Sequence, residues 1–150
     1  MDAGSRLDQF ISRYAPEVAD DGRRALKILA RKFPTATKIV YDNYNALAVG
    51  FSASDRGGDA ILSIALYPRY VSLFLLQGAS LKDPEGVLEG TGSRVRHIKL
   101  RPISRLEASE VIALIDAAVA AGHTPFPSNG KGPLIIKSVV SKTRPRRPRA

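Results

Sequence analysis

The stretch AILSIALYPRYVSLFLL, residues 60–76, decides the fold class. In its first half, apolar side chains alternate with small or polar ones, which is the two-residue period of a strand with one buried face. Pro68 then turns the chain, and a mostly apolar run follows. The stretch therefore predicts two successive antiparallel strands, over residues 60–67 and 71–76.

Three further strands are predicted on either side of this pair. Residues 38–41 and 46–51 are largely apolar, and the turn-forming tetrapeptide Asp42-Asn43-Tyr44-Asn45 between them favours a hairpin. After a glycine-rich loop, residues 94–101 alternate again and predict a fifth strand. Together these segments predict an antiparallel meander of about five strands.

Helices are predicted at both ends of the meander. The first begins at Ser5 and the second at Pro16, which suits the first turn of a helix. Ser104 and Glu107 have the spacing of a capping box, which predicts a long third helix ending at Gly122. We therefore expect an α+β fold, in which an antiparallel sheet packs against N-terminal and C-terminal helices.

The chain divides into a body and an extension. Residues 1–122 carry all the elements above and predict one domain. Residues 123–133 are rich in Pro, Gly and Ser and predict a linker, and residues 134–140 are apolar enough for an additional edge strand. Residues 141–150 have the composition of a disordered basic tail.

Composition excludes several classes of function. The chain has no Cys, so disulfides, thiolate zinc sites and cysteine nucleophiles are absent, and its two His leave little for a catalytic metal. No apolar run is long enough to span a bilayer, and the N-terminus lacks the pattern of a signal peptide. We therefore expect a cytoplasmic protein without membrane contact.

Net charge is concentrated near the C-terminus. The chain carries +9, and seven cations without a single acid lie between Lys131 and Ala150. Spaced guanidinium groups on an extended, proline-containing segment suit contact with phosphates. The candidate residues for binding nucleic acid or another polyanion are Lys142, Arg144, Arg146, Arg147 and Arg149. The alternative is a solubilising tail with no dedicated partner.

A second candidate site is the glycine loop before the fifth strand. Backbone amides around Gly90 and Gly92, backed by Arg94 and Arg96, could hold a small anion. The alternative is a turn-rich connection with solvated arginines.

A third candidate is a group of tyrosine and amide side chains that could line a pocket. The alternative for this group is a hairpin tip with cross-strand aromatic packing. Its members are Tyr41, Asn43, Tyr44 and Asn45, together with Tyr67 or Tyr70.

No arrangement of residues points to catalysis. His97 has no second His at ligand spacing and is interpreted as structural, and Ser104 lacks the glycine-flanked elbow of a nucleophile. We predict no catalytic residue, no cofactor and no metal ligand. The leading prediction is a non-enzymatic binding module.

Four segments carry a family resemblance: Phe33-Pro34-x-Ala36-x-Lys38, Leu66-Tyr67-Pro68, Gln77-Gly78-Ala79-x-Leu81-x-Asp83-Pro84 and Leu88-Glu89-Gly90-x-Gly92-x-x-Val95-Arg96-His97-Ile98. With the order of elements from Leu7 to Ala121, they resemble the YdhG-like domain of unknown function. The resemblance implies a frataxin-like sandwich of helices on a sheet. It also implies a second functional alternative, because one branch of the family has been proposed as an iron chaperone.

The residues of this chain depart from the iron-binding pattern. Frataxin-like iron binding relies on an acidic ridge, whereas five cations follow the acids of the second helix here. Iron prefers clustered carboxylates. Folding would have to assemble such a cluster from Asp20, Asp21, Asp83, Glu85 and Glu89. No iron ligand is therefore assigned, and a small-anion binder that uses the glycine loop is the remaining alternative.

Overall fold

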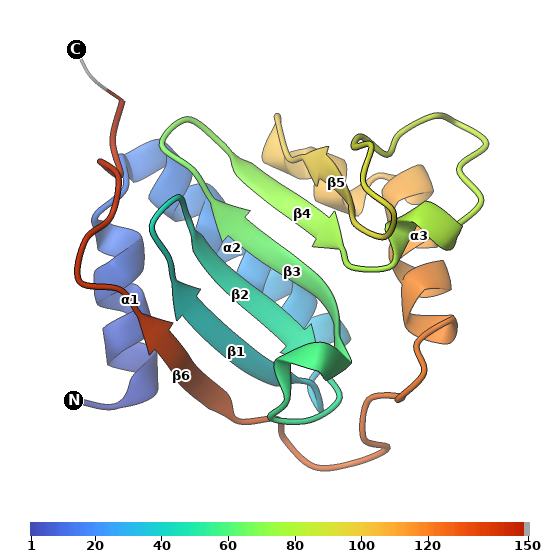
Figure 1. Ribbon diagram of the computed structural model, residues 1–150, viewed down its shortest axis with the longest axis horizontal. Coiled ribbons are helices and arrows are strands. Elements are labelled where there is room, and N and C mark those ends of the chain that lie inside the picture. Colours follow the sequence, from blue (N-terminus) through green and yellow to red (C-terminus); the bar gives the residue numbers. More distant parts are fainter. Residues whose placement is uncertain (149–150) are drawn as a thin grey trace.

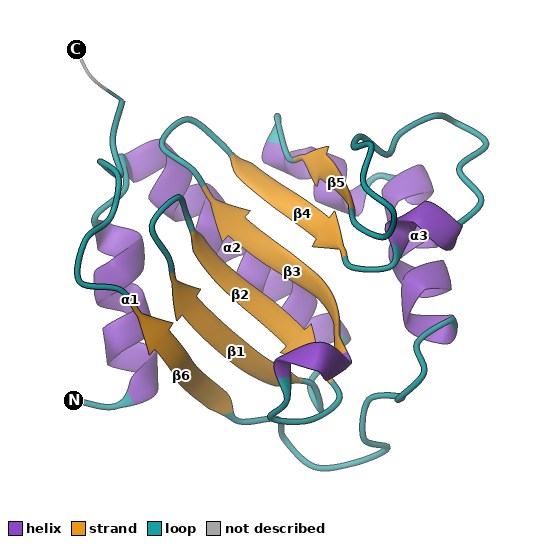
Figure 2. Cartoon of the chain, in the orientation of Figure 1, coloured by secondary structure: helices purple, strands orange, loops and turns teal. Residues whose placement is uncertain are grey.

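The computed structural model describes residues 1–148 (Figures 1 and 2), which form an α+β fold, as the sequence predicts. Three short 3-10 helices accompany the main elements: η1 (Gly57–Asp59), η2 (Gly78–Ser80) and η3 (Ile103–Glu107). The main elements in chain order are α1 (Ala3–Ser12), α2 (Pro16–Lys32), β1 (Thr37–Asp42), β2 (Leu47–Ser52), β3 (Ala60–Leu66), β4 (Val71–Leu75), β5 (Arg96–Lys99), α3 (Ser109–Ala120) and β6 (Leu134–Val139).

The sheet has six strands in the order β5-β4-β3-β2-β1-β6. Strands β1 to β5 form the antiparallel meander that alternation predicts. Strand β6 pairs parallel with β1, with Leu134 opposite Lys38 and Val139 opposite Asp42. The sheet is therefore mixed, which corrects the expectation of about five antiparallel strands. A parallel neighbour requires a crossover connection, and the segment after α3 supplies it.

One face of the sheet carries the hydrophobic core. In Figure 1 helix α2 crosses behind the sheet, and its Ala25 and Leu29 are completely buried there. The buried side chains of β3, Leu62, Ile64 and Leu66, belong to the same cluster. None of the helices within residues 1–148 is long and apolar enough to cross a membrane.

The opposite face of the sheet has no helix over its central strands (Figure 1). Because side chains alternate between faces, the residues between the core positions of β2, β3 and β4 point to this open face. One cross-strand row consists of Ala48, Ala65, Ser72 and Lys99. The next row consists of Gly50, Ser63, Phe74 and His97. The centre of the open face therefore carries small side chains.

Two predicted helix starts are wrong. Helix α1 begins at Ala3, because the Asp2 carboxylate accepts the Ser5 amide and caps it earlier than expected. The predicted capping box at Ser104 does not form. The Glu107 carboxylate pairs with Arg24 of α2 at 3.1 Å, residues 103–107 form η3, and α3 starts afterwards.

The C-terminal segment, defined here as residues 140–148, is not a disordered tail. Its amides at Val140 and Arg144 donate to the carbonyls of Asp42 and Tyr44, at 3.1 and 2.8 Å. The segment thereby continues beyond β6 along the turn between β1 and β2. Its Arg146 is only 6% exposed. The composition typical of disorder is overridden here by tertiary contacts.

Candidate functional site

A shallow groove of about 550 Å³ lies on the open face of the sheet. It extends from the turn between β1 and β2 across β2 and β3 to β4. We call it the sheet groove. Its lining residues are Asn43, Tyr44, Asn45, Ala46, Ala48, Ser63, Ala65, Tyr67, Phe74, Leu76 and Val140.

The groove follows from the sizes of its side chains. Ala48 on β2 pairs with Ala65 on β3, and Ser63 stands on the same face one row away. These short side chains leave space above the sheet. Larger rings rise around them, from Tyr67 after β3 and Phe74 on β4. The result is a hollow with a small, flat base and aromatic margins.

The margin toward β5 consists of stacked aromatic and basic side chains. The rings of Tyr67 and Tyr70 stack with their centroids 5.1 Å apart. The Lys99 Nζ lies 5.2 Å from the centre of the Tyr70 ring, and Phe74 packs against His97 at 5.4 Å. Burial, reinforced by the neighbouring Tyr70, raises the pKa of Tyr67 above its usual range. Its hydroxyl therefore stays protonated at neutral pH and can donate a hydrogen bond.

The margin toward the C-terminal segment has the same combination of ring and cation. Tyr44 is 47% exposed, and the guanidinium carbon of Arg144 lies 5.5 Å from the centre of its ring. A cation at this distance over an aromatic face is attracted to it. Arg144 therefore lies at one margin of the sheet groove. Lys99 lies outside the other margin, over the Tyr70 ring that stacks on Tyr67.

Four of the tyrosine and amide residues named from the sequence meet in this groove. Asn43, Tyr44, Asn45 and Tyr67 all line it. Tyr41 does not, because it lies next to the loop before β3, where its hydroxyl approaches Gly57. The small residues of the base are not among those named from the sequence. Ala48, Ser63 and Ala65 could have been found as short side chains on the non-core face of adjacent strands.

The C-terminal segment is anchored by a buried ion pair. Arg146 Nη2 lies 2.9 Å from Asp42 Oδ1, and the side chains are only 4% and 2% exposed. The same guanidinium donates to the carbonyls of Asn43 and Tyr44, and it lies 5.6 Å from the centre of the Tyr14 ring. Paired and hydrogen-bonded in this way, Arg146 has an internal structural role.

Asp42 also forms an ion pair with Arg13, which follows the last residue of α1. Arg13 Nη1 lies 3.2 Å from Asp42 Oδ2, and the Arg13 side chain is about half exposed. Arg147 Nε donates to the Arg13 carbonyl at 3.1 Å. The N-terminal helix and the C-terminal segment therefore meet at the end of β1.

These contacts divide the predicted polyanion-binding residues into three kinds. Arg146 is buried and engaged. Lys142, Arg144 and Arg147 are exposed. Arg149 lies outside the described residues. Three of the five predicted cations therefore face solvent.

The glycine loop is arranged around its own arginine. Arg96 Nη1 donates to the carbonyls of Gly92 and Val95. Gly90 has a φ of +123°, a conformation that favours glycine. Arg94 is exposed. Carbonyl oxygens of the loop therefore point toward the Arg96 guanidinium. Binding of a small anion by this loop stays a prediction.

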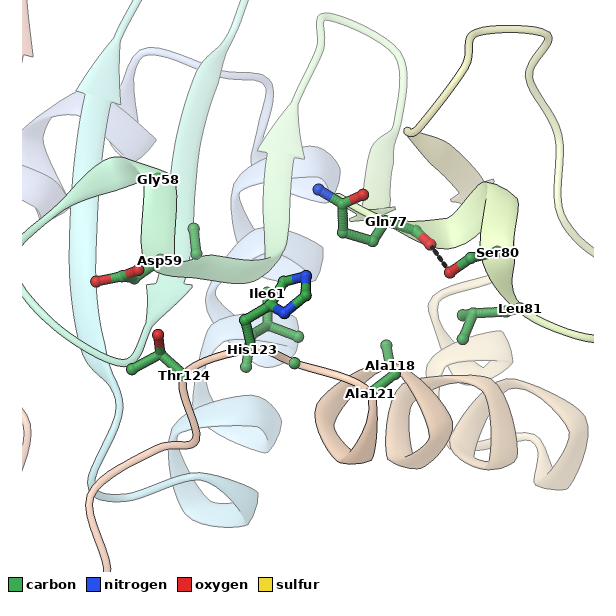
Figure 3. Close-up of a pocket in the computed structure, with 12 residues that line it drawn as sticks. Gly58, Asp59, Ile61, Gln77, Ser80, Leu81, Ala118, Ala121, His123 and Thr124 are labelled. Atoms are coloured by element: carbon green, nitrogen blue, oxygen red, sulfur yellow. Dashed lines mark hydrogen bonds between the residues drawn. The ribbon is translucent and has the colours of Figure 1, made fainter.

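A second hollow, of about 290 Å³, lies where β3 begins, beside η2 and the end of α3 (Figure 3). Its base is apolar and includes Ile61, Leu81 and Ala118. Figure 3 shows Gln77 and His123 at its margin, and both side chains are exposed. Polar groups that orient a ligand are usually few and well fixed. Neither hollow has a buried polar side chain of that kind among the described residues. We place the candidate site in the sheet groove because four of the residues named from the sequence meet there.

The five carboxylates that iron binding would require do not form a metal site. Within residues 1–148, no three His, Asp or Glu side chains are grouped so as to hold a metal ion. The Asp83 carboxylate instead accepts the amides of Val87 and Leu88 at 2.9 and 2.8 Å and stabilises its loop.

Comparison with known proteins adds no assignment. No protein-family model, no curated protein and no solved structure matches the chain.

Proposed function

We propose that this chain is a non-enzymatic binding module of the YdhG-like type that contacts nucleic acid through its C-terminal segment. The observation that carries the proposal is the exposure of three cations, Lys142, Arg144 and Arg147, on a segment whose backbone bonds to the turn between β1 and β2. Arg144 among them lies over Tyr44, which lines the sheet groove. The YdhG-like part of the proposal rests on the sequence resemblance between Leu7 and Ala121 alone.

Charge complementarity favours a phosphate backbone as the ligand. The described part of the chain beyond Gly130 contains six cations and no acid. Arg146 uses its charge internally, so it anchors the segment while its neighbours stay free to contact solvent. Cations on a fixed backbone lose less conformational freedom on binding than cations on a mobile tail.

The salt dependence of binding tests this proposal. Fluorescence anisotropy would follow labelled single-stranded and duplex oligonucleotides over a salt series, with the wild type and the triple variant Lys142→Gln, Arg144→Gln, Arg147→Gln. Loss of three phosphate contacts should reduce the log–log slope by about 2 for a single strand and about 3 for a duplex.

A matched control removes the same charge from elsewhere. Lys27, Arg31 and Lys82 are exposed and do not belong to the C-terminal segment or the sheet groove, so their triple replacement by Gln should leave the slope nearly unchanged. Equal loss in both triple variants would show a diffuse charge effect and would refute the assignment to the C-terminal segment. Absence of measurable binding by the wild type at low salt would refute the function itself.

A further inference from the structure

We infer that the sheet groove accepts an unpaired nucleobase, so that the nucleic acid bound is single-stranded. This inference rests on the proposed function and adds the class of ligand. The C-terminal segment on its own offers cations and no aromatic side chain between residues 140 and 148. The fold places it beside aromatic rings from the turn between β1 and β2 and from the region of β3 and β4.

The shape of the groove suits a planar ring. The methyl groups of Ala48 and Ala65 and the short Ser63 side chain form a base without protrusions. Tyr44 and Phe74 stand at its margins. A base placed there can contact an aromatic ring, and stacking of this kind is the main sequence-tolerant interaction of single-strand binders.

The groove also offers hydrogen-bonding groups that the protein itself leaves unused. Among residues 1–148, no hydrogen bond engages the side-chain amides of Asn43 and Asn45 or the hydroxyls of Ser63 and Tyr67. Amides and hydroxyls can donate to or accept from the edges of a base. The combination of an aromatic margin with free polar groups fits a nucleobase better than a phosphate alone.

The charges are placed for the backbone of such a strand. Arg144 lies over Tyr44 at one margin, and Lys99 lies over Tyr70 toward the other. A strand that crosses the groove with its base inward can therefore meet a cation on each side. A duplex keeps its bases stacked inside and would present only phosphates, leaving the aromatic margins without a function.

The exposed Tyr44 provides the test. Its ring is nearly half exposed and its removal leaves no cavity in the core, so Tyr44→Ala should fold. We expect this variant to bind oligo(dT) about fivefold to 150-fold more weakly than the wild type, which corresponds to the loss of one stacked base. Its binding to an abasic oligonucleotide of the same length and to a duplex should not change.

Two further variants separate stacking from other causes. Tyr44→Phe keeps the ring and should bind oligo(dT) as the wild type does. Ala48→Leu fills the base of the groove and should weaken oligo(dT) binding selectively, while circular dichroism checks that both proteins remain folded.

The outcomes distinguish this inference from the proposed function. If the wild type binds oligo(dT), the abasic strand and duplex equally well, and Tyr44→Ala changes none of them, the base-binding groove is refuted while the proposed function stands. If the wild type binds none of the three probes, the proposed function fails and the inference fails with it. Selective loss for oligo(dT) in Tyr44→Ala and Ala48→Leu supports both.

Discussion

Replacing Arg146 with Met should destabilise the folded protein although Arg146 lies in a segment rich in proline and arginine. The substitution keeps a long apolar side chain and removes the guanidinium. Asp42, which is 1% exposed, then loses its closest cation, and the carbonyls of Asn43 and Tyr44 lose a donor. Burial of an uncompensated carboxylate is the dominant cost.

The magnitude follows from the remaining contacts of Asp42. Breaking one partner of a buried ion pair typically costs about 3–5 kcal/mol. Arg13 still lies 3.2 Å from the other carboxylate oxygen, which reduces the loss of stability. Arg146 Nε has no hydrogen-bond partner among residues 1–148, which reduces it further. We therefore expect about 3 kcal/mol, which corresponds to roughly 6–12 °C in Tm for a chain of this size.

Urea unfolding followed by circular dichroism measures this loss. Arg147→Met is the matched control, because Arg147 is exposed and its Nε donates only to the Arg13 carbonyl. The double variant Asp42→Asn, Arg146→Met should be less unstable than the sum of the single variants, since it removes both members of the pair. A loss below about 1 kcal/mol for Arg146→Met, or one equal to that of Arg147→Met, would refute the anchoring role of the ion pair.

Three further perturbations test other parts of the fold. Burial is the main cause that raises the pKa of Tyr14 from 10.0 to about 12, so the unfolded chain releases this proton at a lower pH than the folded protein does. The free energy of unfolding should therefore fall between pH 10 and about 12 and then level off. Unfolding curves and the tyrosinate absorbance measure this change, and Tyr14→Phe should lack it. Gly22→Ala would place a Cβ 2.7 Å from a methyl group of the buried Leu66. We expect the free energy of unfolding to fall by about 1 kcal/mol despite the better helix propensity of Ala, and Leu66→Val in the same chain should recover much of this loss. A single variant more stable than the wild type would contradict this packing argument. Gly132→Ala would place a Cβ 1.8 Å from the carbonyl oxygen of Ala36, so β6 should separate from β1. Hydrogen exchange of the backbone amides in β1 should then accelerate. Unchanged exchange would contradict this expectation and show that the backbone can move aside.

Local sequence patterns predict the meander because every strand in it pairs with a neighbour in the chain. Alternation around Ser63 identifies the core face and, by exclusion, the open face. The turn after β1 is likewise encoded locally, in Asp42-Asn43-Tyr44-Asn45. This is why the antiparallel part of the sheet and most residues of the third candidate site could be predicted without the structure.

Long-range contacts explain what the sequence could not show. The apolar residues of β6 indicate a strand, but their periodicity has no information on its direction. The segment around Arg146 has the composition of a disordered tail, and its partner Asp42 lies 104 positions away. Glu107 was available for a local cap and pairs instead with Arg24 of α2. In each case a tertiary contact outweighs the local preference.

Contacts that join α1, β1 and the C-terminal segment affect how this protein folds during its synthesis. At 5–20 residues per second, Arg146 leaves the ribosomal active site roughly 5–20 s after Asp42. Until β6 follows, β1 is an unpaired edge strand that contains Ile39 and Val40. An exposed apolar edge is a template for pairing with other chains. A ribosome that stalls before residue 134 would therefore leave a nascent chain whose exposed edge is prone to aggregate. Residues 134–146 both close this edge and neutralise the buried carboxylate of Asp42.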